Sequence, residues 1–104
     1  MSAPPLHAAE RLQFALAGCG ISTDINHDHD VAVVSVWADL LVLTDGFVYR
    51  WWTGQLSSRT GRRLYAICDA SDSAFAARCV VQRYEELRKS HPYRHPMPML
   101  AAPM

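Results

Sequence analysis

Hydrophobic residues recur every three or four positions near both ends of the chain, which is the spacing of one face of a helix. In the first of these stretches they are Ala8, Leu12, Ala15, Leu16 and Cys19. A proline pair precedes this stretch and two glycines follow it, and these residue types suit the first turn and the end of a helix. The pattern therefore predicts a helix over residues 5–18.

The second helical stretch lies near the other end of the chain, and its hydrophobic stripe consists of Ala76, Val80, Tyr84 and Leu87. Three residues before the stripe are candidate caps: Asp69, Ser71 and Ser73. Because proline cannot continue a helix, this one should end before Pro92. Residues 92–104 contain proline too often for regular structure, so we expect a single domain over residues 1–91 and a Pro-rich flexible tail over residues 92–104.

Between the two helical stretches the pattern changes to short runs of β-branched and aromatic residues. These runs are residues 21–25, 31–37, 40–44, 47–53 and 63–68. Asp45-Gly46, between the third and fourth runs, is the dipeptide typical of a two-residue hairpin turn. We therefore expect a two-layer α+β fold in the order α-β-β-β-β-β-α. Its antiparallel sheet of four to five strands would have both helices packed on one face.

The Asp45-Gly46 turn would pair Thr44 with Phe47 and so decide which side chains of this hairpin share a face. One face would carry Leu40, Val42, Thr44, Phe47, Tyr49 and Trp51. The other face would carry Leu41, Leu43, Val48, Arg50 and Trp52. Both faces are apolar, but two helices can cover only one. Because an unpartnered arginine is costly to bury, we expect the helices to cover the first face and leave the second exposed.

The exposed second face is the candidate partner-binding surface. Contiguous exposed apolar side chains, with tryptophan and arginine among them, are typical of protein interfaces. We therefore expect a small non-enzymatic protein–protein interaction module, most simply a homodimer in which Arg50 faces an acid such as Asp39. A simpler interpretation is that Trp52 folds over the sheet edge or is covered by the tail residues Met97, Met99 and Leu100.

Charge is unevenly distributed along a chain whose formal net charge is zero. Residues 1–45 carry one base and six acids, net −5, and residues 46–104 carry nine bases and four acids, net +5. The second half includes Arg50, Arg59, Arg62 and Arg63, close in sequence to Tyr65 and other aromatic residues. Arginines beside stacking rings bind single-stranded nucleic acid, so a nucleic-acid-binding accessory protein is the alternative function. An ordinary hairpin loop explains the same arginines, and Arg62 and Arg63 would point to opposite sides of a strand.

A third hypothesis is a metal-dependent enzyme at His27 and His29, which alternate with Asp28 and Asp30. Imidazole and carboxylate groups are ligands for zinc, iron or manganese. The site would need a further ligand, however, and a solvated loop between two strands explains the same four residues. We otherwise expect no cofactor and no catalytic residue, because Cys68 and Cys79 lie among apolar residues with no histidine nearby in the sequence.

The remaining sequence signals concern location. Three cysteines at unpatterned spacing fit a reducing cytoplasm. Residues 16–19 match the box at which bacterial lipoproteins are cleaved, but Glu10, Arg11 and Gln13 interrupt the apolar stretch that a signal peptide needs. No segment approaches the length of a membrane-spanning helix. We therefore expect a cytoplasmic protein that does not bind a membrane, and the Arg-rich, Lys-poor composition suggests a bacterial source.

Overall fold

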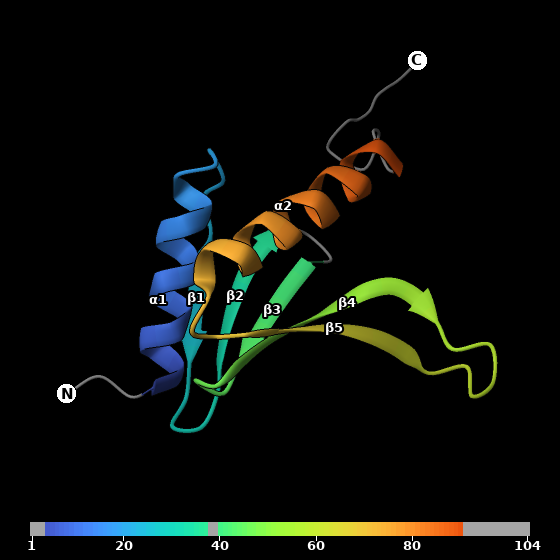
Figure 1. The fold of residues 1–104 in the computed structure, drawn as a ribbon, viewed down its shortest axis with the longest axis horizontal. Coiled ribbons are helices and arrows are strands. Elements are labelled where there is room, and N and C mark those ends of the chain that lie inside the picture. The colour runs from blue at the N-terminus through green and yellow to red at the C-terminus, as the bar shows by residue number, and fades with distance from the viewer. Residues whose placement is uncertain (1–3, 38–39, 91–104) are drawn as a thin grey trace, which may run out of the picture.

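The computed structural model describes residues 4–37 and 40–90. Its elements are α1 (Pro4–Ala17), β1 (Asp24–His27), β2 (Ala32–Trp37), β3 (Leu40–Thr44), β4 (Val48–Leu56), β5 (Arg63–Asp69) and α2 (Ser73–Ser90). The strands form one sheet in chain order, and every neighbouring pair is antiparallel. Both helices lie against the same side of this sheet (Figure 1). The predicted α+β architecture is therefore confirmed, whereas the predicted tail at residues 92–104 lies outside the described residues.

The core lies between the helices and one face of the sheet. Alternate residues of β2 and β3 are buried there, as are two aromatic residues of β4: Ala32, Val34, Val36, Leu40, Val42, Tyr49 and Trp51. The helices contribute mainly alanine and aliphatic residues, namely Ala8, Ala9, Leu12, Leu16, Ala76, Ala77, Val80 and Leu87. Helices α1 and α2 also contact each other, so the two ends of the described chain are joined over the sheet.

The β3–β4 hairpin has a different register from the one predicted. Thr44 pairs with Tyr49 rather than with Phe47, and Leu43 pairs with Arg50. The turn is longer than two residues because the Asp45 carboxylate accepts hydrogen bonds from the N–H groups of Phe47 (2.8 Å) and Val48 (3.2 Å). These two bonds also hold the pKa of Asp45 below its usual value.

The register differs from the prediction by two residues, so the side chains within the strands keep their predicted faces. Phe47 is the exception, because it lies in the turn instead of in the strand. It is 73% exposed and does not belong to the core, so its predicted place on the covered face is wrong.

The predicted element ends are corrected at two places by hydrogen bonds. The first strand begins at Asp24 rather than at residue 21, because Ile21 completes the end of α1 by donating its N–H to the Leu16 carbonyl (3.0 Å). The cap of α2 is Asp72, which was not among the three predicted candidates. Its carboxylate accepts the Phe75 N–H at 3.0 Å, whereas the Asp69 carboxylate binds the Ser71 N–H in the preceding turn.

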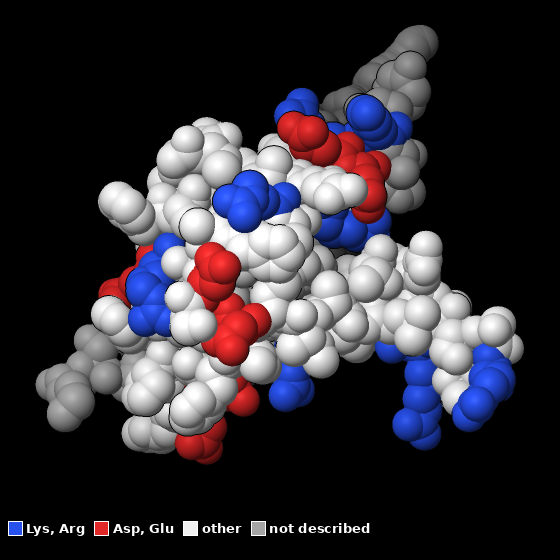
Figure 2. Space-filling view, viewed as in Figure 1, with Lys and Arg blue, Asp and Glu red and all other residues white. Residues whose placement is uncertain are grey.

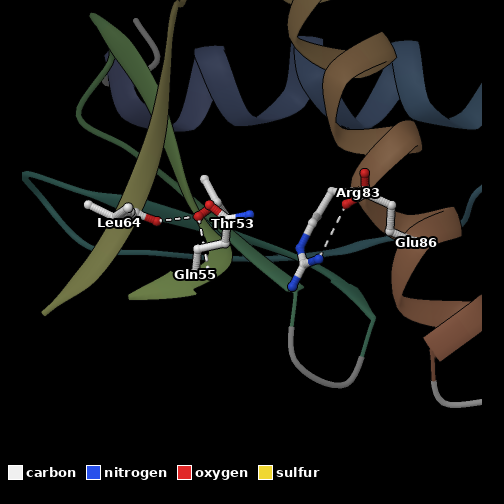
Figure 3. A network of polar contacts seen from close by, with 5 residues as sticks. All are labelled: Thr53, Gln55, Leu64, Arg83 and Glu86. Atoms are coloured by element: carbon white, nitrogen blue, oxygen red, sulfur yellow. Dashed lines mark hydrogen bonds and ion pairs between the residues drawn. The ribbon is translucent and has the colours of Figure 1, made fainter. Parts of the chain in front are cut away.

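Beyond the helices, β4 and β5 continue as a two-stranded extension that we call the arm, residues 53–64 (Figure 1). Among the described residues, β4 pairs with β3 at only two positions, whereas its pairing with β5 extends to Leu56. The register between β4 and β5 shifts between Trp52 and Leu56. Within this irregular stretch, the Thr53 hydroxyl donates to the Leu64 carbonyl at 2.9 Å, and the Arg83 side chain extends from α2 toward β4 (Figure 3).

Candidate interaction surface

The face of the sheet that points away from the helices is the second face predicted from the sequence. We call it the open face and define it by Val33, Leu41, Leu43, Val48, Arg50, Trp52, Tyr65 and Ile67. The strand pairing places these residues on one side because they alternate with the buried residues of the core. The described part of the chain therefore covers one apolar face of the sheet and leaves the other without a helix.

One row of directly opposed residues crosses the middle of the open face. Val33 pairs with Leu43, Leu43 with Arg50, and Arg50 with Ile67, so the row spans four strands. Leu43 is 38% exposed although it lies on a central strand, and Ile67 is 62% exposed on the edge strand. Side chains on a central strand are ordinarily covered on both faces or polar on one, so an exposed leucine there marks an unpaired apolar surface.

A hollow of about 280 Å³ lies beside this row. It is lined by Val31, Leu43, Thr44, Asp45, Val48, Arg50 and Tyr65. The apolar walls come mainly from β3, β4 and β5, and the two charged groups are Arg50 and Asp45. The hollow has the apolar lining with few polar groups that a partner's side chain would fill.

Trp52 lies on the open face but is partly covered by its own chain. The Arg63 guanidinium carbon lies 4.3 Å from the centre of the Trp52 ring, and the indole N–H donates to the Gln55 carbonyl at 3.1 Å. Trp52 is therefore half-buried and held in place, with its stacking partner supplied by β5. Asp39, expected to face Arg50, and the tail residues, expected as a cover for Trp52, lie outside the described residues.

The four candidate nucleic-acid-binding arginines do not form a single cluster. Arg50 lies in the middle of the open face and Arg63 stacks on Trp52, which pairs with Tyr65. Arg59 and Arg62 instead occupy the turn at the end of the arm, where the Ser57 hydroxyl accepts the Arg59 N–H. No acid occurs between residues 46 and 68, and basic side chains are the only charged ones over the arm in Figure 2.

His27 and His29 lie at the exposed connection between β1 and β2. The Asp28 N–H donates to the Val31 carbonyl at 2.8 Å, and the Asp28 carboxylate accepts the N–H of His29, so these residues form a hairpin turn. Within residues 4–37 and 40–90, no group of three or more His, Cys, Asp or Glu side chains is placed to hold a metal ion. The structure thus gives the pair no further ligand from the described chain.

Cys68 and Cys79 approach each other where β5 meets α2. Burial raises the pKa of the Cys68 thiol, and the neighbouring Cys79 thiol adds to this effect. A raised pKa decreases the thiolate fraction at neutral pH, which is the opposite of what a nucleophilic cysteine requires. Both thiols pack against the core, whereas Cys19, after α1, is exposed.

Two members of the open face on β5, Tyr65 and Ile67, were not assigned to this surface from the sequence. The alternation of Arg63, Tyr65 and Ile67 is visible in the sequence, but their alignment with β4 depends on the irregular register near Gly54.

Comparisons with protein-family models, curated proteins and solved structures found no match for this chain. None of the helices in the described part of the chain is both long and apolar enough to cross a membrane.

Proposed function

We propose that this protein is a non-enzymatic interaction module that binds a second copy of itself through the open face. The exposed leucine at the centre of a sheet whose other face packs against the helices is the observation that carries the proposal. A C2 contact would bury Leu41, Leu43 and Val48 against the same residues of the partner, and the half-buried Trp52 would lie at its margin.

Apolar surface that remains in water supplies the driving force for this contact. Each fully buried aliphatic side chain contributes about 1.5–3 kcal/mol, and a twofold contact counts each residue twice. The arm also favours such a contact, because a two-stranded ribbon without a packed face has marginal stability in water. A partner that covers the open face would also cover the base of the arm at Trp52 and Tyr65.

We expect Leu43→Gln to weaken self-association at least about tenfold, since it replaces a central apolar contact by an amide that must lose its hydration. Sedimentation equilibrium of the wild type and the variant at tens of micromolar measures this change. Because Leu43 points away from the core, the variant should keep the circular dichroism spectrum of the wild type, and its melting temperature should match the wild type's at concentrations where both are monomers.

Phe14→Gln is the matched control for this experiment. Phe14 is 83% exposed on α1 and is absent from the open face, so its replacement removes a comparable apolar side chain without changing association. A wild type that is monomeric at these concentrations would contradict the proposal, as would a dimer that Phe14→Gln disrupts and Leu43→Gln does not.

A second candidate function is the binding of single-stranded nucleic acid by the arm and its base. It is favoured by four arginines without an acid between residues 46 and 68, and by the opposed rings of Trp52 and Tyr65. Backbone phosphates would bind the guanidinium groups, while bases would stack on exposed ring faces.

A fluorescently labelled single-stranded oligonucleotide tests this candidate. If the arm binds it, replacing Arg59 and Arg62 together by alanine weakens binding. A plot of the logarithm of the binding constant against the logarithm of the salt concentration then becomes less steep, by about 0.7 for each phosphate that the protein no longer neutralises. Arg78→Ala on α2 is the control and should leave both values unchanged. Binding that is absent at low salt, or that does not depend on salt, rejects this candidate.

A further inference from the structure

Strand β5 forms one edge of the sheet. Among the described residues it pairs only with β4, and all 7 of its residues are exposed or half-buried. An unpaired edge presents a row of N–H and C=O groups to another strand, and proteins usually protect such an edge with charged residues, proline or a very short strand. Residues 64–68 contain neither a charge nor a proline, whereas the other edge strand, β1, has only 4 residues and begins with Asp24. Strand β5 is therefore the edge that is open to pairing.

The hydrogen bonds to β4 show which backbone groups of β5 point outward. The Ala70 N–H donates to the Phe47 carbonyl (2.9 Å), and the Ser57 N–H donates to the Arg62 carbonyl (2.8 Å). Because such groups alternate along an antiparallel strand, the even-numbered residues direct theirs to β4 and the odd-numbered residues direct theirs outward. The outward groups belong to Arg63, Tyr65, Ile67 and Asp69, of which the Asp69 carbonyl already accepts the Asp72 N–H.

The sequence of β5 is complementary to itself in one antiparallel register. The strand extends from Arg63 to Asp69, so its central residue is Ala66. Two copies with their Ala66 residues opposite each other would pair over the whole strand. In this register the opposed pairs are Arg63 with Asp69, Leu64 with Cys68, and Tyr65 with Ile67. Opposite charges and an aromatic ring beside a β-branched side chain are favourable cross-strand pairs.

Other registers lose the charge pair. Because only the odd-numbered residues direct backbone groups outward, the two strands can slip only by steps that keep odd residues opposite odd ones. Centring the pair on Tyr65 places Arg63 opposite Ile67, and centring it on Ile67 places Asp69 opposite Tyr65. A parallel pairing in register would place arginine beside arginine and aspartate beside aspartate, which is unfavourable. Both charge and strand length therefore favour the register centred on Ala66.

The charges next to β5 on the open-face side agree with this direction. Asp45 lies at the acidic end of the strand, because it lines the hollow together with Val48, which pairs with Asp69. Arg50 pairs with Ile67 near the middle of the strand, so it favours neither direction.

The helical side carries both signs of charge at the same end. Asp72 caps α2, Arg11 donates to the Ala70 carbonyl at 2.7 Å, and the Arg78 guanidinium carbon lies 5.7 Å from the centre of the Phe75 ring. Each of these groups is engaged by its own chain, and together they give no net preference. The charge pairing is therefore decided on the open-face side, by Arg63 and Asp69.

We propose that β5 pairs with β5 of a second copy in the register centred on Ala66, so that the two sheets join into one continuous sheet. A twofold axis perpendicular to the sheet would pass between the two Ala66 residues, and the outward backbone groups of Tyr65 would bond those of Ile67 in the second copy. This edge contact is separate from the open-face contact proposed above and places the two open faces side by side.

Ile67→Pro tests the edge contact in a Leu43→Gln host, whose open-face contact is weakened. Proline removes the outward N–H without removing a bond to β4, which an edge strand tolerates. Sedimentation should show the host dimer weakened about tenfold or more, because each dimer loses the bond twice. Ile67→Thr is the matched control. It changes the same side chain but keeps the N–H, so most of the affinity should remain.

Cysteine cross-linking tests the register and does not require that proline be tolerated. Tyr65→Cys and Ile67→Cys chains, both in the Leu43→Gln host with Cys19→Ser, are mixed in oxidised glutathione. Each disulfide formed between two chains reduces one glutathione disulfide to two thiols. In the mixed pair the two Cα atoms lie about 5.5 Å apart, within the range of a disulfide. Either chain alone has its cysteines two residues further apart along the strands, beyond the limit of about 7 Å, so it should cross-link much less.

Charge reversal with rescue tests the terminal pair. Arg63→Glu in the host should weaken the edge dimer about tenfold, because it places carboxylates opposite each other at both ends. Adding Asp69→Asn to the same chain should recover most of this loss, since the amide oxygen still accepts the Ser71 N–H but no longer repels. Asp24→Asn, on the opposite edge strand, changes the net charge equally and is the control that should recover none of it.

The outcomes separate the edge contact from the open-face contact. A Leu43→Gln host that is monomeric at hundreds of micromolar would overturn the edge contact, as would equal weakening by Ile67→Thr and Ile67→Pro. Equal cross-linking of the mixed and single chains, or equal rescue by Asp24→Asn and Asp69→Asn, would reject the register. Association that the edge variants weaken and Leu43→Gln does not would keep the edge contact and reject the open-face contact.

Discussion

At the scale of single residues, Tyr49 is the clearest link between the sheet and α1. Its side chain is fully buried, and its hydroxyl donates a 2.7 Å hydrogen bond to the Ala8 carbonyl. The bond gives the buried phenol an acceptor and joins the sheet to the backbone of α1. The hydrophobic pattern predicted that Tyr49 would face the helices, but it did not predict which backbone group its hydroxyl would bind.

We expect Tyr49→Phe to lower the free energy of unfolding by about 1–2 kcal/mol, because it leaves the Ala8 carbonyl without this donor. Urea denaturation at neutral pH measures the loss. Burial raises the pKa of Tyr49, and the nearby Arg11 offsets part of this effect. The stabilisation is therefore complete below the unfolded-state pKa of about 10 and is lost as the pH rises through the higher folded-state value. The variant should therefore lose less of its free energy of unfolding than the wild type as the pH rises above about 10. An equal loss in the two proteins would contradict the assignment.

At the scale of elements, the start of α1 is fitted closely to the β3–β4 turn. Gly46 has a φ of 99°, and a side-chain carbon added there would lie 2.7 Å from the Pro4 Cβ and 2.9 Å from the Pro4 carbonyl carbon. Two rigid segments therefore meet at a residue that has no side chain, so the turn helps to position the helix.

Gly46→Ala should consequently destabilise the fold by about 2 kcal/mol or more, from an unfavourable backbone conformation and from displacement of α1. Gly61→Ala is the control, because its φ is also positive but nothing lies within 4 Å of the added carbon. Thermal unfolding should show a smaller loss for the control, of about 1 kcal/mol. Equal losses would mean that the contact with Pro4 has no energetic role.

The elements themselves were largely predictable, since hydrophobic periodicity identified two helices and five strands in the observed order. The connections were less so. Whether Asp45 forms a two-residue turn or accepts hydrogen bonds from Phe47 and Val48 is decided by a few competing bonds that the hydrophobic pattern does not encode. For the same reason, Asp72 replaced the predicted caps of α2. The two-residue change in register preserved the faces because side chains alternate with period two.

At the scale of the whole molecule, the hydrophobic pattern predicted that one apolar face of the sheet would have no helix over it, but it did not predict how far that face extends. Alternating apolar residues on both sides of β3 and β4 indicated that one face would remain without helices. The contribution of Ile67 and Tyr65 depends on how β5 aligns with β4, and the arm depends on where β4 leaves β3. Both follow from the irregular stretch around Gly54, whose effect on the direction of a strand is set by its surroundings.

These surroundings include Arg83, whose guanidinium lies where a side chain of residue 54 would be, with its carbon 2.7 Å from that position. The same guanidinium pairs with the Glu86 carboxylate at 3.3 Å, so the group is braced from α2. Helix α2 therefore supports the start of the arm through the Arg83 side chain. A change at position 83, on the helical side of the sheet, would therefore let the arm tilt and would move Trp52 and Tyr65 on the opposite, open face.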